Sequence, residues 1–256
     1  MRTRAVPQVT QRDIAKGLRE LELKSGDGVL VHSSLSSFGH VINGADAVID
    51  ALLEVVGDTG DVLVPTLTGT EDDGPTMPPV FDVRSTPCWT GRIPNVFMNR
   101  KDARRSLHPT HSVSGIGPNI ASMEEGHSDC LTPCGQSSPY YRLAQRGGYI
   151  LLIGVGQDSN TTIHTAEELA EVPYHMQKEP TDTRVIDHEG VQRVKRLFLH
   201  DWGTPREFQR IDDQLLGLGI MRMGKVGGST LRLIRSLAML DWLVGVLRED
   251  PRYLCV

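Results

Sequence analysis

The sequence predicts one layered α/β/α domain over residues 1–256, with a mixed central sheet. Three observations predict this fold class: short apolar segments alternate with segments of helical spacing, polar clusters follow the apolar segments, and one segment alternates like a β-hairpin. Crossover strands and hairpin strands together indicate a sheet that is partly parallel and partly antiparallel. The chain has 256 residues, of which 39% are hydrophobic, and this is enough to bury one sizeable core.

The N-terminal part is expected to alternate between helix and strand. Apolar residues recur at helical spacing over residues 10–24, after a threonine that suits the N-cap, and a turn with two glycines follows at residues 25–28. Residues 29–31 form a short apolar segment typical of a buried strand. We expect a helix over residues 45–56, closed by a glycine, and a second buried strand over residues 61–64.

The rest of the chain carries weaker signals of regular structure. Residues 69–94 are rich in Pro, Gly, Asp and Thr without periodicity, so we expect a long ordered excursion over the surface. Residues 149–155 predict a third strand, and residues 162–172 predict a helix after a polar turn. Alternation over residues 181–199 predicts a hairpin, and residues 208–247 are expected to be helical with an interruption at two glycines.

Composition argues against several classes of partner. The chain has 27 basic and 32 acidic residues, a net charge of −5, which disfavours nucleic acid and is compatible with a polycationic small ligand. No run of eighteen apolar residues occurs, so we expect no membrane insertion and a cytoplasmic location, as a monomer or a homodimer. The cysteines have neither disulfide-like nor zinc-like spacing, which predicts a reduced protein without a bound metal: Cys88, Cys130, Cys134 and Cys255.

The common nucleotide and hydrolase motifs are missing from the sequence. It contains no GxGxxG after a strand, no GxxxxGK[ST] and no GxSxG. Instead, polar clusters rich in His, Ser and Thr stand at residues 32–34, 105–112 and 160–167. The first and third of these clusters directly follow predicted strands, where side chains can gather at one rim of a sheet.

These clusters carry a resemblance to a known family. Residues 30–70, which begin LVHSSLSSFG and end DVLVPTLTGT, closely resemble the opening of the aminoglycoside 3-N-acetyltransferases. Residues 105–112 are similar to the family's RSxHPxxS, residues 135–139 to its GxxSP, and residues 152–167 to its LLGVGxxxNTxxHxAE. Further similarity at residues 224–227 and 248–251 extends the resemblance over about residues 12 to 254. Several weak motifs in the right order make chance similarity very improbable.

The resemblance implies both a fold and a reaction. The fold is the antibiotic N-acetyltransferase type, which differs from that of the commoner GNAT acetyltransferases. The donor is acetyl-coenzyme A, and the acceptor is the 3-amine of the 2-deoxystreptamine ring of an aminoglycoside, so that the enzyme confers antibiotic resistance. The resemblance also suggests direct transfer, without an acyl-enzyme.

We expect the catalytic groups to be His164, Glu167 and Asp201. Acetyl transfer to an amine needs a base for the amine proton, and an imidazole suits this task near neutral pH. In a helix Glu167 lies on the same face as His164, three residues earlier, and it can orient the imidazole or attract the cationic acceptor. Family members carry an acidic residue some forty positions beyond the histidine, and Asp201 is the candidate here, with Glu207 behind it.

The remaining site residues are assigned to the two substrates. For coenzyme A, the turn after the first strand offers backbone N–H groups and hydroxyls, and the 105–113 segment offers charge-assisted contacts to phosphate. The expected coenzyme contacts are His32, Ser33, Ser34, Leu35, Arg105, Ser106, Ser112 and Val113. For the polycationic acceptor, an acidic cluster on the long excursion would supply attraction, and the expected contacts are Glu71, Asp72, Asp73, Thr161 and Glu207.

Three alternatives stay open at this point. The same donor chemistry could serve a different amine-containing natural product. Ser33, His164 and Asp201 could instead form a hydrolytic triad, in which case ester turnover would depend on Ser33. The protein could also bind an antibiotic without any catalysis. The range of accepted aminoglycosides is not set by any readable pattern in the sequence.

Overall fold

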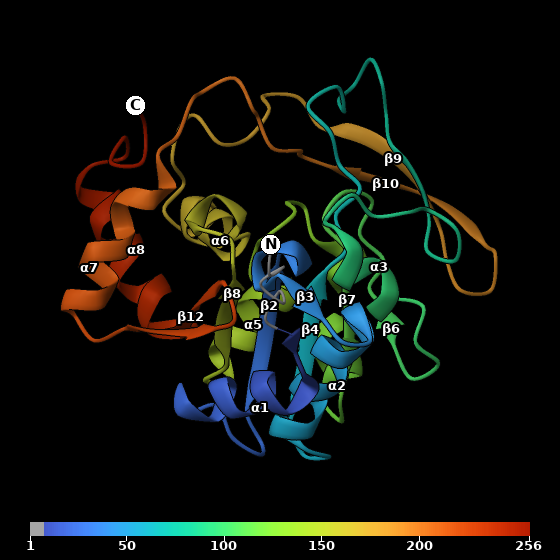
Figure 1. Cartoon of the computed structure of the whole chain (residues 1–256). Coiled ribbons are helices and arrows are strands. Elements are labelled where there is room, and N and C mark those ends of the chain that lie inside the picture. The colour runs from blue at the N-terminus through green and yellow to red at the C-terminus, as the bar shows by residue number, and fades with distance from the viewer. Residues whose placement is uncertain (1–7) are drawn as a thin grey trace, which may run out of the picture.

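Seven strands form the central sheet of the computed structural model, which describes residues 8–256 (Figure 1). The spatial order is β11-β12-β8-β2-β4-β7-β6. The three central strands β8, β2 and β4 are parallel, and antiparallel strands flank them on both sides, so the predicted mixed sheet is confirmed. The strands are β2 (Gly28–Ser33), β4 (Asp61–Pro65), β6 (Arg104–Arg105), β7 (Val113–Ile116), β8 (Tyr149–Ile153), β11 (Met221–Val226) and β12 (Ser229–Arg235).

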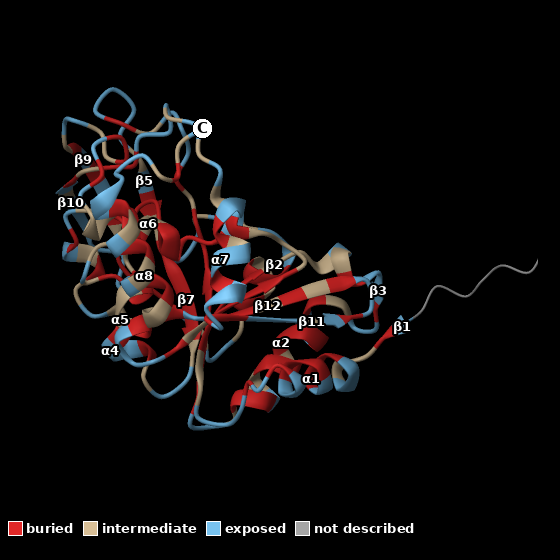
Figure 2. Cartoon of the chain, turned by 90° about the vertical axis from the view of Figure 1, so that its left-hand side faces the viewer, coloured by how far each residue is buried: buried red, intermediate tan, exposed pale blue. Residues whose placement is uncertain are grey.

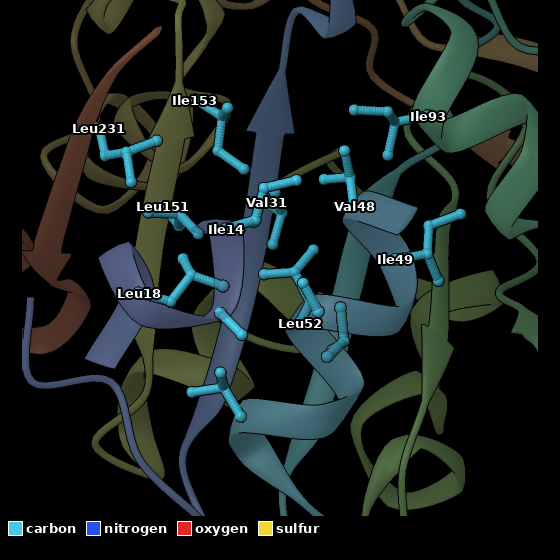
Figure 3. Packing of buried hydrophobic residues seen from close by; sticks show 14 of the residues in the cluster. Ile14, Leu18, Val31, Val48, Ile49, Leu52, Ile93, Leu151, Ile153 and Leu231 are labelled. Carbon is cyan, nitrogen blue, oxygen red and sulfur yellow. The ribbon is translucent and has the colours of Figure 1, made fainter. Parts of the chain in front are cut away.

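One face of the sheet is covered by α1 (Gln11–Glu20), α2 (Gly44–Val56) and α3 (Arg92–Phe97). The apolar residues of α1 and α2 recur at helical spacing and pack on the side chains that β2 and β8 direct to this face, as Figure 3 shows. Helix α1 begins at Thr10, whose side chain forms a reciprocal capping box with Asp13, so the N-cap prediction is confirmed.

The opposite face is covered by a second set of helices. These are α4 (Ile120–Glu124), α5 (Pro139–Gln145), α6 (Thr162–Leu169) and α8 (Ser236–Glu249), with α7 (Asp212–Gly217) beside them. Figure 2 shows the buried sheet between the two helical layers. Because strand side chains alternate, Leu30 packs on this side while its neighbours Val29 and Val31 pack on the other. The layered α/β/α fold class is thereby confirmed.

Two small sheets lie outside the central one. Strands β1 (Gln8–Val9) and β3 (His40–Val41) form a parallel pair, and β5 (Val80–Asp82), β9 (Thr181–Ile186) and β10 (Gln192–Leu197) form a three-stranded sheet. Figure 1 shows β9 and β10 at one side of the molecule, away from the central sheet. The hairpin predicted over residues 181–199 is confirmed. Single turns of 3₁₀-helix complete the structure: η1 (Leu35–Phe38), η2 (His127–Asp129), η3 (Gln157–Ser159) and η4 (Phe208–Ile211).

The prediction of a largely helical segment over residues 208–247 was wrong in its middle part. Strands β11 and β12 form a hairpin there, with Val226 paired to Ser229 across a two-residue turn. Gly227 has φ +56°, and an added Cβ would lie 2.7 Å from the backbone oxygen of Phe38, so only glycine fits this turn. The two glycines therefore join strands instead of interrupting a helix.

The excursion at residues 69–94 contains more regular structure than predicted. It includes β5 and the start of α3, although its sequence has no periodicity. Strand β5 pairs in parallel with β9, which lies about a hundred residues later in the chain, so its hydrogen-bond partners could not be read from its own sequence. Over residues 8–256 the structure contains no helix of sufficient length and apolar character to cross a membrane.

Candidate active site

A cleft opens where the three parallel strands end. The carboxyl ends of β2, β4 and β8 meet at one edge of the sheet, the usual position of a ligand site in parallel α/β folds. The cleft has a volume of about 320 Å³, and its walls include His32 and Ser33 from β2, Pro65 from β4 and Val155 after β8. Helix α6 completes the wall with His164.

His164 and Glu167 form a hydrogen-bonded pair in this wall. The distance from Nδ1 of His164 to Oε2 of Glu167 is 2.6 Å, and the spacing of three residues on α6 brings the two side chains to one helix face. The Glu167 side chain is fully buried, whereas 12% of the His164 side chain is exposed at the cleft. The carboxylate favours the tautomer with a proton on Nδ1, which leaves Nε2 as the nitrogen that can accept a proton.

Glu167 is held by two further groups. Arg206 Nε lies 3.1 Å from Oε1, and His175 Nδ1 lies 3.3 Å from Oε2. Burial alone would raise the pKa of this carboxyl, but the hydrogen bond from His164 and the nearby His164, His175 and Arg206 charges lower it to about 2. The carboxylate is therefore ionised and fixed in position, as an orienting partner for an imidazole must be.

Asp201, which we expected to pair with His164, is engaged elsewhere. Its Oδ1 accepts a hydrogen bond from the backbone N–H of Gly203 at 2.8 Å, and its backbone oxygen accepts one from Arg206 at 3.0 Å. The carboxylate therefore closes a local turn, while Glu167 takes the position beside the imidazole. Arg206 occupies the segment in which the acidic partner was sought.

A second histidine and carboxylate pair lies next to the first. Nε2 of His200 is 3.0 Å from Oε1 of Glu168, and both side chains are buried. Burial raises the pKa of Glu168 to about 8, so this carboxyl differs sharply from its neighbour Glu167. His32 also lines the cleft, and burial together with the His164 charge lowers its pKa to about 3, which makes it a neutral imidazole.

A second hollow adjoins the cleft. It has a volume of about 570 Å³ and shares Ser33 and Gly91 with the cleft. Its walls include Ser34 and Leu35, as predicted for coenzyme contacts, and also Arg92 at the start of α3. The hydroxyl oxygen of Ser33 is buried and without a hydrogen-bond partner among the described residues, so it is available at the junction.

The other predicted coenzyme contacts lie inside the protein. The guanidinium of Arg105 donates to the backbone oxygens of Thr66 and Thr86 and to the hydroxyl of Ser112, and it stacks over the ring of Phe81. Burial lowers its pKa to about 10. These groups tie β6 and β7 to β4, and the structure thus places the Arg105 guanidinium inside the protein and not at either hollow. Ser106 and Val113 are likewise buried and hydrogen-bonded to each other.

The predicted acceptor contacts are divided between the cleft and other places. Thr161 lines the cleft, as expected. Asp73 instead caps the turn at Thr70, with a distance of 2.8 Å to that backbone nitrogen, and Glu207 pairs with Arg210 at 2.8 Å. Asp158 is the one carboxylate among the cleft residues within the described part of the chain. The acidic cluster at residues 71–73 is therefore not among the residues that line this cleft.

Several cleft residues were missed by sequence reasoning. Asp158 lies in the polar turn after β8, and a carboxylate just after a predicted strand could have been proposed as a site residue from the sequence. Trp89 and Trp202 line the cleft with indole rings that are 58% and 40% exposed, an unusual exposure for this side chain. The sequence around Arg206 does not indicate its role, because its partner Glu167 on α6 lies 39 residues earlier in the chain and is brought next to it only by the fold.

Comparison with known proteins agrees with this geometry. The sequence profile described as aminoglycoside 3-N-acetyltransferase matches residues 30–248. The chain belongs to this family. Aminoglycoside N(3)-acetyltransferase IV of Salmonella sp is 33% identical over 238 residues, which cover 91% of this chain and 85% of that protein.

Two solved structures of the family are also close to this fold. A mutant of the aminoglycoside acetyltransferase AAC(3)-IVa in complex with a gentamicin is 27% identical, with a TM-score of 0.84 over 98% of this chain and 93% of that one. AAC-IIIb in a binary complex with CoASH is 25% identical, with a TM-score of 0.81 over 95% of this chain and 97% of that one. The resemblance seen in the sequence motifs and the expected fold type are confirmed.

Proposed function

We propose that the protein transfers acetyl from acetyl-coenzyme A to the 3-amine of the 2-deoxystreptamine ring of an aminoglycoside, with His164 as general base. The observation that carries this proposal is the His164 and Glu167 pair at the wall of the cleft. Family membership supports the reaction class, and relatives bound to CoASH and to a gentamicin support the two substrates. The activity would inactivate the drug and so confer resistance.

The proposed reaction is a direct attack within a ternary complex. Nε2 of His164 takes a proton from the acceptor amine as the amine nitrogen attacks the thioester carbonyl carbon. The C–S bond of the tetrahedral intermediate then breaks, and the imidazolium returns the proton to the leaving thiolate, which releases coenzyme A as the thiol. Glu167 holds the imidazole in the productive tautomer and stabilises its protonated form. The unpartnered hydroxyl of Ser33 is placed to donate to the oxyanion of the tetrahedral intermediate.

We assign the donor to the hollow beside Ser34 and Leu35. Its larger volume suits an extended chain, and Arg92 at its wall is a phosphate ligand of the right charge. The acetyl group would then pass Ser33 and Gly91, which belong to both hollows, and reach His164. This assignment replaces Arg105 with Arg92 as the cation for phosphate.

We assign the acceptor to the cleft between Trp89, Trp202 and Asp158. Exposed indoles offer flat faces to sugar rings and cations, and the carboxylate attracts an ammonium group. Acylation of another amine-containing natural product is the alternative, because these features would also bind other amines. A panel of aminoglycosides and unrelated amines, each assayed for released thiol, separates the two.

We further propose that residues 1–256 act as one catalytic unit in the cytoplasm. Strands from residues 28 to 235 share one sheet, and the cleft draws side chains from residues 32 to 202. The four cysteines are unpaired, as suits a reducing compartment.

The decisive experiment replaces the proposed base. His164→Gln and His164→Ala, supplied with acetyl-coenzyme A and gentamicin, should release thiol at least about a hundredfold more slowly, since general base catalysis contributes 10²–10⁴. Unchanged turnover by a correctly folded variant would contradict the proposal. Ser33→Ala tests the hydrolytic triad: loss of an oxyanion donor should slow transfer by about 10²–10³, whereas an acyl-enzyme trapped in the wild type and absent from Ser33→Ala would favour the rival mechanism.

A further inference from the structure

Three imidazoles meet behind the cleft and form what we call the histidine cluster: His164, His175 and His200. Their ring centroids lie 5.0 Å, 4.8 Å and 4.1 Å apart, and one ring nitrogen from each lies within 4.8 Å of the other two. The base role proposed above uses only His164. The other two histidines are buried, and neither lines the cleft.

Each ring of the histidine cluster is backed by a carboxylate on one nitrogen only. Oε2 of Glu167 contacts Nδ1 of both His164 and His175, and Oε1 of Glu168 contacts Nε2 of His200. On the opposite side, Nε2 of His175 and Nδ1 of His200 are buried without a partner among the described residues. A carboxyl group on one nitrogen of an imidazole, with the other nitrogen unpartnered, is the arrangement that orients histidine ligands in metal sites.

We propose that the histidine cluster binds one zinc-class divalent cation, and that this ion blocks the catalytic imidazole. Imidazole nitrogen is a good ligand for Zn²⁺, and three of them leave a fourth position open toward the cleft. Because His164 lines the cleft, the ion has a path from solvent.

The site must adjust to close on an ion. Zinc–nitrogen bonds of about 2.0–2.1 Å place tetrahedral ligands roughly 3.4 Å apart, so the ring nitrogens must approach by up to about 1.5 Å. The rings of His164 and His175 are stacked with an angle of 17° between their planes, so one of them must also turn before both lone pairs point at one ion. Arg206 opposes the cation, since its Nη2 lies 3.3 Å from Nδ1 of His175, and the ionised carboxylate of Glu167 offsets that repulsion.

A second possible ligand set shares one member of the histidine cluster. It comprises His111, Cys134 and His200, whose ligand atoms also lie within 4.8 Å of one another. Burial raises the pKa of the Cys134 thiol well above its usual value, which disfavours the thiolate that zinc requires. His175 belongs only to the proposed site and Cys134 only to this other set, so the two can be tested separately.

Direct metal binding tests the site. The full chain, stripped with EDTA, is titrated with Zn²⁺ against a chromogenic chelator and with Co²⁺ monitored by visible absorption. We expect the wild type to bind one ion per chain and to show the absorption bands of tetrahedral Co²⁺. The Cys134→Ser variant should show the same stoichiometry and the same bands. Binding should be at least about tenfold weaker in His175→Gln and about tenfold weaker in Glu168→Gln, which loses the carboxylate behind His200.

The outcomes separate this inference from the proposed function. Equal Zn²⁺ affinity in the wild type and in a folded His175→Gln, or loss of binding in Cys134→Ser, would overturn the site. Folding of each variant is checked by its thermal unfolding transition. We also expect Zn²⁺ to inhibit acetyl transfer and EDTA to reverse the inhibition, and this expectation rests on the proposed function. If Zn²⁺ binds to the histidine cluster without inhibiting transfer, the metal site is supported but the role of His164 as the base is contradicted.

Discussion

Arg206 and His164 contact opposite oxygens of the Glu167 carboxylate. Nε of Arg206 lies 3.1 Å from Oε1, and Nδ1 of His164 lies 2.6 Å from Oε2. The Arg206 side chain is 7% exposed, its Nη2 also donates to the backbone oxygen of Asp201, and its guanidinium lies over the ring of Tyr174. Arg206 is therefore a positioning residue: it fixes the carboxylate that fixes the proposed base.

Replacing Arg206 should affect both stability and turnover. Arg206→Met leaves the buried Glu167 charge without its cation, so we expect the free energy of unfolding to fall by about 3–5 kcal/mol, measured by urea denaturation. In the folded fraction kcat should fall on the order of tenfold to a hundredfold, because a carboxylate free to turn no longer aligns the imidazole.

The matched variant for this prediction is Arg206→Lys. It keeps the charge but lacks the planar fork through which Nε and Nη2 of Arg206 reach Glu167 and the Asp201 carbonyl, so a smaller loss of kcat is expected. The KM for acetyl-coenzyme A should stay constant in both variants, since Arg206 does not line the donor hollow. A rise in that KM with unchanged kcat would contradict a positioning role.

Asp158 and Asp72 form a second test pair, because both are acidic but only Asp158 lines the cleft. Asp158→Asn should raise the KM for a polycationic aminoglycoside by roughly tenfold and leave the KM for the donor unchanged, since an ammonium group loses a charged partner. Asp72→Asn should change neither constant. Steady-state assays of thiol release measure the KM values for acceptor and donor. An equal effect of Asp158→Asn and Asp72→Asn would instead support the acidic cluster at residues 71–73 as an acceptor contact.

Local signals in the sequence predicted the parts of the fold that depend on local structure. The capping box at Thr10 and the helical spacing of Ile14 and Leu18 are set within one turn of helix, and the structure has this helix. Strand β12 was missed because Leu231 and Leu233 alternate within a segment that was interpreted as helix, and its pairing with β8 comes from far along the chain. The segment could be interpreted as a helix or as a strand, and it forms a strand because it pairs with β8.

The candidate site shows the same division between local and distant determinants. The pairing of His164 with Glu167 was predicted because both lie on α6, three residues apart. The contacts of Arg105 and Asp201 could not be read from the sequence, because a charged side chain binds whichever groups the fold brings to it. Only the three-dimensional arrangement showed that Arg206 is the group beside Glu167.

The core beneath α2 should be sensitive to loss of volume. Leu52 is fully buried and packs in the cluster between α1, α2 and the sheet (Figure 3). Leu52→Ala should lower the free energy of unfolding by about 2–5 kcal/mol, because it removes buried methyl groups and leaves a cavity. Leu218→Ala, at a side chain that is 52% exposed, should change it by less than about 0.5 kcal/mol. Chemical denaturation with an unchanged m-value measures both, and similar losses at the two positions would contradict the assignment of the core.

Glu124 should make stability depend on pH near neutrality. Burial raises its pKa from an ordinary value of 4.5 to about 7, against the opposing charge of Arg104. Between these two pH values the folded protein retains a proton that the unfolded chain has released, so its stability falls as pH rises and levels off above the folded-state pKa. Glu124→Gln removes this titration. The wild type should therefore lose stability relative to Glu124→Gln between about pH 5 and pH 8, as measured by urea denaturation at each pH. Glu125→Gln, at the exposed neighbouring position, should follow the wild-type curve, and a wild type that gains stability over this range would exclude the raised pKa.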